Sequence, residues 1–81
     1  MKPLYSKQAA KYINSLDASS QQRIRKGISK IPEGDIRPLK GALGNYRLRV
    51  GDWRILFDYA ENNSVRVKKI GPRGQIYKER G

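Results

Sequence analysis

The chain contains no cysteine and no histidine, and only seven of its 81 residues are acidic. Without cysteine no disulfide can form, and without either of these metal ligands a conventional zinc site is not expected. The N-terminus has no apolar run typical of a signal peptide, and no stretch is long enough to span a bilayer. These absences predict a cytoplasmic protein with no cofactor, no metal and no membrane-spanning segment.

Basic residues are abundant by comparison, with 18 lysines and arginines that give a formal net charge of +11. A chain of this length is expected to form a single domain over residues 1–81. Because charge of one sign on so small a surface opposes the compact state, a polyanionic partner is expected. Nucleic acid is the favoured class of partner, and an anionic membrane or an acidic protein are the alternatives.

Two segments in the first half have the spacing of amphipathic helices, and residues 3–5 are typical of a short strand. Ser6 is a suitable N-cap for a helix that continues to about Leu16. A second helix is predicted over about residues 20–31, because a proline and a glycine follow it. The apolar positions of the two helices are Ala9, Tyr12, Ile13, Leu16, Ile24, Ile28 and Ile31. Neither helix can bury its apolar face alone, so we expect this αα-hairpin to pack on a sheet.

Three segments in the second half supply that sheet, because apolar residues alternate with charged ones along much of their length. These predicted strands cover residues 46–50, 53–59 and 64–68. The sequence therefore predicts an α+β fold, in which an N-terminal αα-hairpin packs on one face of a small, mainly antiparallel, twisted sheet.

The connections between these strands predict which residues lie opposite one another. Gly51-Asp52 is typical of a two-residue hairpin turn, which places Arg49 directly across from Arg54. For the second hairpin, a three-residue loop over residues 61–63 keeps one face of both strands apolar, whereas a two-residue turn does not. A bulge at the following Lys69-Ile70 would return Ile70 to the core.

This register gathers basic side chains on the sheet face turned away from the helices, with Asp58 as the single predicted acid. The basic residues are Arg47, Arg49, Arg54, Arg66 and Lys68. Like charges directly opposite one another destabilise a sheet, and no acid is expected within reach of Arg49 and Arg54. An ordinary solvated face is the alternative, but planar guanidinium groups suit phosphate oxygens. We interpret the face as an anion site.

Several short motifs, in this order and spacing, resemble the RelE/ParE toxin superfamily and within it the RelE-like mRNA interferases. The motifs are Leu-Lys-Gly at 39–41, Tyr-Arg-Leu-Arg at 46–49, Trp-Arg-Ile-Leu-Phe at 53–57, Gly-Pro-Arg at 71–73 and Ile-Tyr at 76–77. The resemblance implies a RelE-like fold and a toxin of a type II toxin–antitoxin system. It further implies a ribosome-dependent endoribonuclease that cleaves mRNA in the A site by 2′-hydroxyl attack and so inhibits translation.

The resemblance also implies partners and residue roles. The partners would be mRNA, the ribosome with its 16S rRNA, and an acidic RelB-like antitoxin, without which the chain would be a monomer. The implied catalytic residues are Arg49, Arg54, Arg73 and Tyr77, with Arg54 and Arg73 stabilising charge and Tyr77 as the hypothetical general base. The implied RNA-binding residues are Arg47, Arg66, Lys68 and Lys40.

One departure from the family pattern affects these roles. Family members often have lysine where this chain has Arg47 and Arg49, and arginine stays protonated at any physiological pH. These two residues are therefore expected to bind RNA and stabilise charge, and not to accept a proton. Basic residues at 23–30 are interpreted either as rRNA contacts or as a solvated helix face.

Two rival functions remain open from the sequence. A ParE-like inhibitor of DNA gyrase would share the fold, although it would not need the strand arginines and the terminal tyrosine together. A non-catalytic RNA-binding or ribosome-binding module would need only the charge.

Overall fold

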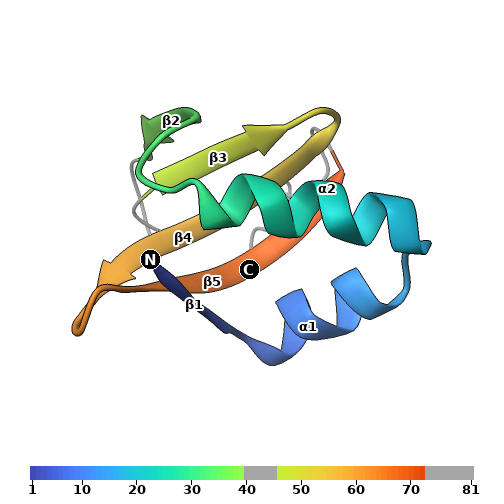
Figure 1. The fold of residues 1–81 in the computed structure, drawn as a ribbon, viewed down its shortest axis with the longest axis horizontal. Coiled ribbons are helices and arrows are strands. Elements are labelled where there is room, and N and C mark those ends of the chain that lie inside the picture. Colours follow the sequence, from blue (N-terminus) through green and yellow to red (C-terminus); the bar gives the residue numbers. More distant parts are fainter. Residues whose placement is uncertain (40–45, 73–81) are drawn as a thin grey trace.

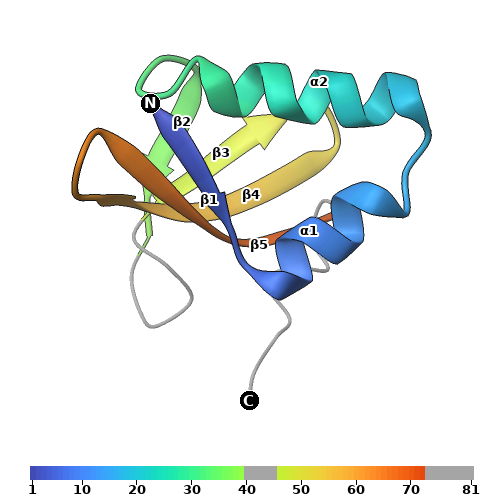
Figure 2. The same ribbon diagram turned by 60° about the horizontal axis from the view of Figure 1, so that its bottom comes forward.

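The structure is a computed structural model that describes residues 1–39 and 46–72. Two helices lie on one face of a twisted five-stranded sheet (Figures 1 and 2). In chain order the elements are β1 (Lys2–Tyr5), α1 (Lys7–Asn14), α2 (Ala18–Ser29), β2 (Asp35–Pro38), β3 (Tyr46–Val50), β4 (Trp53–Ala60) and β5 (Ser64–Pro72). The strand order is β1-β5-β4-β3-β2, with β1 parallel to β5 and every other pair antiparallel. The predicted α+β fold is confirmed.

The first helix begins where its sequence predicts. The Ser6 hydroxyl accepts a hydrogen bond from the backbone N–H of Ala9 at 3.0 Å, as an N-cap side chain should. The helix ends at Asn14, two residues short of the predicted end. The second helix lies two residues earlier than predicted, with Asp17 at its N-cap, and Ile31 falls just beyond its last turn.

The central hairpins have the predicted register. The turn at Gly51-Asp52 pairs Val50 with Trp53 and Arg49 with Arg54, and Gly51 has a φ of 56°, which glycine adopts without strain. The loop at 61–63 pairs Ala60 with Ser64, which gives the three-residue connection.

The predicted bulge is also present. The register shifts beside Leu56, so that Lys69 and not Lys68 lies opposite Leu56, and Ile70 returns to the core at 1% exposure. Lys68 is the extra residue of this bulge, which therefore lies one position before the predicted Lys69-Ile70.

Two features of the sheet differ from the sequence-based expectation. The strand β2 was not predicted, because it is only four residues long and ends on a proline. The strand β5 continues through Gly71 and Pro72, which pair with Arg54 and Trp53 and so do not form a turn. Hydrogen bonding to neighbouring strands thus adds β2 at one edge and lengthens the interior strand β5 beyond what the local pattern shows.

Side chains near the start of α1 bind the backbone of β5 beyond the end of β1. The Ser6 hydroxyl donates to the carbonyl oxygen of Lys68 at 2.8 Å. The Gln8 amide donates to the carbonyl of Ile70 at 3.1 Å and accepts from its N–H at 3.0 Å. These hydrogen bonds satisfy backbone groups of β5 that lie beyond its pairing with β1. They also hold α1 against β5.

The core lies between the helices and the sheet. The apolar faces of α1 and α2 pack against the apolar faces of β3, β4 and β5. The buried residues are Ala9, Ile13, Ile24, Ile28, Ile31, Leu48, Ile55, Phe57, Val65, Val67 and Ile70. Phe57 is fully buried, and its ring lies 5.6 Å from Tyr46 and 5.5 Å from Tyr59, centroid to centroid. This layer covers one face of the sheet, and the basic side chains project from the other face, where Leu56 is also fully buried.

Candidate nucleic-acid interface

Basic residues gather on the sheet face opposite the helices, as the register predicts. Arg47 and Arg49 come from β3, Arg54 from β4, and Arg66 and Lys68 from β5. The edge strands extend this set, because Arg37 lies opposite Arg47 and the parallel β1 places Lys2 beside Ser64. We call this surface the open face.

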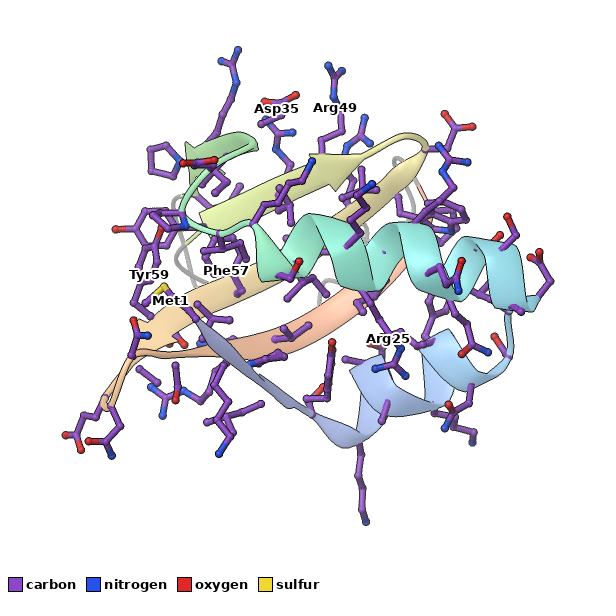
Figure 3. All side chains as sticks on the ribbon, viewed as in Figure 1. Met1, Arg25, Asp35, Arg49, Phe57 and Tyr59 are labelled. Carbon is purple, nitrogen blue, oxygen red and sulfur yellow. The ribbon has the colours of Figure 1, made fainter. Side chains whose placement is uncertain are left out.

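The expectation that no acid lies within reach of Arg49 is wrong. Asp35 is the cross-strand partner of Arg49, and its Oδ2 lies 2.7 Å from Nε of Arg49. The Oδ1 of the same carboxylate lies 3.8 Å from Nη2 of Arg47 and 4.0 Å from Nε of Arg37. Figure 3 shows Asp35 and Arg49 side by side at the β2–β3 edge. Local pattern offers little sign of this contact, because the contact depends on a strand that the pattern does not predict.

A second carboxylate neutralises part of the other end of the open face. Asp58 accepts a hydrogen bond from Nε of Arg66 at 3.1 Å, and Nζ of Lys68 lies 3.3 Å from its other oxygen. Burial of this carboxyl raises its pKa, but the hydrogen bonds and charges of Arg66 and Lys68 outweigh burial and leave the pKa of Asp58 below its usual range. The Asp58 carboxylate therefore stays ionised near neutral pH.

Arg54 has no carboxylate contact among the described residues, unlike Arg47, Arg49, Arg66 and Lys68. Arg47 is also largely buried, with a side chain that is 13% exposed. Arg54 is only 8% exposed, and its Nη1 donates to the carbonyl oxygens of Gly51 at 3.2 Å and Trp53 at 3.1 Å. Among residues 1–39 and 46–72, no carboxylate oxygen lies within 4.0 Å of its guanidinium group. The carbonyl partners are neutral, so they do not offset the positive charge of Arg54. Their two hydrogen bonds fix the orientation of the guanidinium group.

The side chains of Arg49 and Arg66 are 55% and 58% exposed, so both can reach a ligand in solution. Beside Arg66, an open groove of about 630 Å³ runs between β1 and the β4–β5 loop and is lined in part by Lys2, Leu4 and Tyr59. Leu4 lies opposite Arg66 and is 45% exposed. Sequence reasoning missed this groove because it depends on the pairing of the two ends of the chain.

Three predicted site residues, Lys40, Arg73 and Tyr77, lie outside the described residues. The predicted residues that the structure brings together are therefore the five basic ones of the central strands. The described part of the chain contains no group of three or more acidic, histidine or cysteine side chains arranged to hold a metal ion. Neither α1 nor α2 is long and apolar enough to cross a membrane.

Comparison with solved structures identifies this arrangement. The chain superimposes on a chain of the archaeal RelE–RelB complex from Pyrococcus horikoshii OT3 with a TM-score of 0.67 and 25% sequence identity, over 91% of this chain and 96% of the other. The fold is RelE-like. A chain of the RelB–RelE antitoxin–toxin complex from Methanococcus jannaschii gives a TM-score of 0.68 at 23% identity, over 93% and 95% of the two chains. No family model and no curated protein matches the sequence.

The RelE-like fold fixes the layout of the open face. Its helical layer covers the opposite side, so all five central cations project away from the helices. Asp35 on β2 lies in one cross-strand row with Arg49 and Arg54, whereas Asp58 lies further along β4, opposite Arg66. This arrangement can bind an extended polyanion and place a fixed cation against one of its phosphates.

Proposed function

We propose that the chain, as one domain over residues 1–81, is the toxin of a type II toxin–antitoxin system. In this proposal it is a ribosome-dependent endoribonuclease that cuts mRNA in the A site and so inhibits translation in the cytoplasm. The observation that carries the proposal is the arginine-rich open face on a RelE-like fold. Both similar solved structures are described as RelE–RelB complexes, which supports the toxin assignment.

The proposed chemistry divides between exposed and buried cations. The exposed guanidinium groups of Arg49 and Arg66 bind phosphates of the mRNA, and Lys68, Arg47 and Lys40 are the other proposed RNA contacts. The buried Arg54 is proposed to stabilise negative charge on the phosphorane, because a preorganised cation in a site of low dielectric acts most strongly there. Arg73, outside the described residues, is proposed to share this role.

Cleavage also requires two proton transfers. The 2′-hydroxyl loses its proton as its oxygen attacks the adjacent phosphorus, and the 5′-oxygen of the leaving nucleotide gains one. Tyr77 is the proposed general base, since the chain has no histidine and the arginines stay protonated. The products are a 2′,3′-cyclic phosphate and a free 5′-hydroxyl.

An acidic, RelB-like antitoxin is the proposed binding partner that silences the toxin. The net charge of +11 favours an acidic partner, and the similar solved structures each contain a RelB chain. In its absence the toxin is proposed to be a monomer.

Primer extension on an mRNA under translation in a purified translation system tests the function. The expected result is cleavage within codons, in frame, only when ribosomes are present. Arg49→Ala should reduce it, whereas Lys11→Ala removes the same charge from an exposed position on α1 and should not. Intact mRNA with inhibited gyrase supercoiling would overturn the proposal in favour of a ParE-like activity. Ribosome binding without cleavage would overturn it in favour of a binding module.

A further inference from the structure

One carboxylate on the open face contacts several arginines at once. The Asp35 oxygens lie between 2.7 and 4.0 Å from nitrogens of Arg49, Arg47 and Arg37. Arg47 and Arg49 lie on the same sheet face as Arg54. Among the described residues, Asp35 supplies the carboxylate that lies within 4.0 Å of Arg47 and of Arg49. Without that carboxylate, the positively charged side chains would repel one another and adopt several rotamers. Asp35 therefore determines where these side chains lie.

The contact is made at a particular nitrogen of Arg49. Asp35 contacts Nε, with Oδ2 of the carboxylate 2.7 Å from that nitrogen. A guanidinium group presents five N–H donors, and the two Nη groups form a fork that matches phosphate. An anion on the Nε side thus leaves the fork open toward solvent, where the side chain is 55% exposed.

The same geometry recurs at the other carboxylate of the open face. Asp58 is the cross-strand partner of Arg66 and also binds it through Nε, at 3.1 Å. Two separate strand pairs therefore hold an exposed arginine by the same nitrogen, which leaves the same end free.

From this geometry we infer that Asp35 is a positioning residue of the phosphate-binding site. It holds Arg49, and with it Arg47, so that the Nη fork of Arg49 is already oriented when RNA arrives. The inference deepens the function proposed above and rests on it. Asp35 itself touches no substrate in this account and transfers no proton.

A simple electrostatic role would have the opposite consequence. A negative charge beside an anion site repels phosphate, so its removal would tighten binding and would not slow cleavage. A positioning role predicts a lower rate at saturation, since ordering of the arginine contributes to the transition state. The effect of removing Asp35 on the saturated rate therefore decides between the two.

The test compares Asp35→Asn, Asp35→Glu and Asp52→Asn in single-turnover cleavage of mRNA on programmed ribosomes. Asp52 lies in the exposed β3–β4 turn, so Asp52→Asn makes the same charge change away from Asp35. At saturating toxin, Asp35→Asn should lower the rate about threefold to tenfold, the range expected for an ion pair worth up to about 1 kcal/mol or slightly more. The toxin concentration giving half-maximal rate should stay equal or fall. Asp52→Asn should keep the wild-type rate, and Asp35→Glu should recover part of it.

NMR relaxation of the arginine Nε–H groups supplies a readout that needs no substrate. In the wild type, Arg49 should be more ordered than Arg37, whose side chain is 74% exposed. Asp35→Asn should reduce the order of Arg49 to that of Arg37, with an unchanged melting temperature showing that the fold is intact.

Three outcomes would overturn the inference. These are unchanged order of Arg49 in Asp35→Asn, a saturated rate equal to or above the wild type, or an equal loss of rate in Asp52→Asn. If the wild type itself cleaves no mRNA, the proposed function fails. In that case the relaxation data still show whether Asp35 orders Arg49.

Discussion

Arg49 and Arg54 lie directly opposite each other on β3 and β4, yet their environments differ sharply. The Arg49 side chain is 55% exposed beside the Asp35 carboxylate. Arg54 is 8% exposed, and its Nη1 binds two backbone carbonyls of the adjoining turn. The hairpin register makes the two residues equivalent, but their environments do not. Arg49 is exposed and suited to binding a ligand, whereas Arg54 is buried and held by backbone carbonyls. The predictions below test this division of roles and the packing that supports it.

Arg54→Lys should separate geometry from charge at the buried position. Lysine keeps the positive charge but has a single nitrogen, so it cannot reproduce the orientation that the two carbonyls give to the guanidinium group. We expect single-turnover cleavage to fall about a hundredfold, as for loss of one preorganised charge-stabilising group. The matched control is Arg37→Lys on the same face, which should stay within about twofold because Arg37 is 74% exposed and its ion pair is long. Similar rates for both variants would remove Arg54 from the mechanism.

Tyr77→Phe tests the proposed general base. Loss of the hydroxyl should reduce single-turnover cleavage by about a hundredfold or more while leaving ribosome binding unchanged, because only the proton acceptor is removed. The measurement pairs a quenched cleavage time course with a sedimentation assay for ribosome binding. Tyr12→Phe serves as control, since Tyr12 lies on α1, in the helical layer on the opposite side of the sheet from the cations. Near wild-type cleavage by Tyr77→Phe would assign the base elsewhere.

Asp58 should make stability depend on pH in the acid range. Its pKa is lowered in the folded protein, so its stabilising effect is complete above the unfolded-state value of about 3.9 and is lost as the pH falls through the folded-state pKa. Asp58→Asn should therefore lower the free energy of unfolding at pH 7 by about 1 to 2 kcal/mol, and much less at pH 2. Urea titrations of both proteins from pH 7 to pH 2 measure this difference. An equal cost at both ends would show that the ionised form of Asp58 contributes no stability.

Gly27 should be intolerant of a side chain because of one neighbour. A Cβ at Gly27 on α2 would lie 2.6 Å from Cγ2 of Val50 on β3, closer than any normal contact. Gly27→Ala should destabilise the protein by about 1 kcal/mol, because overpacking of 1 to 3 kcal/mol outweighs the better helix propensity of alanine.

The effect of Gly27→Ala on stability should change sign once the Val50 side chain is shortened. In a Val50→Ala background, Gly27→Ala should stabilise the protein by up to about 1 kcal/mol through helix propensity alone. Urea unfolding of the four proteins of this double-mutant cycle measures the coupling. Additive effects would show that α2 does not pack on β3 through these two residues.

Local pattern was enough to predict the helical hairpin and the central strands. Alternation with a period of two selects one face of a strand, and a two-residue turn at Gly51-Asp52 permits one register. The positions of Arg47, Arg49 and Arg54 on the open face followed from these two facts alone. The bulge that returns Ile70 to the core followed from the break in alternation.

The rest was decided by contacts between segments distant in sequence. The strand β2 forms because the free edge of β3 offers backbone hydrogen bonds to a segment whose own pattern predicts nothing, and that pairing brings Asp35 to Arg49. The parallel pairing of β1 with β5 joins residues about 62 positions apart and makes the groove beside Leu4. Sequence by itself determined that this protein presents a face of arginines. Only the tertiary structure decided which of these arginines contact a carboxylate, which are buried and which are exposed to a ligand. The reason is that the nearby carboxylates and the burial depend on pairing between strands that the local sequence does not predict.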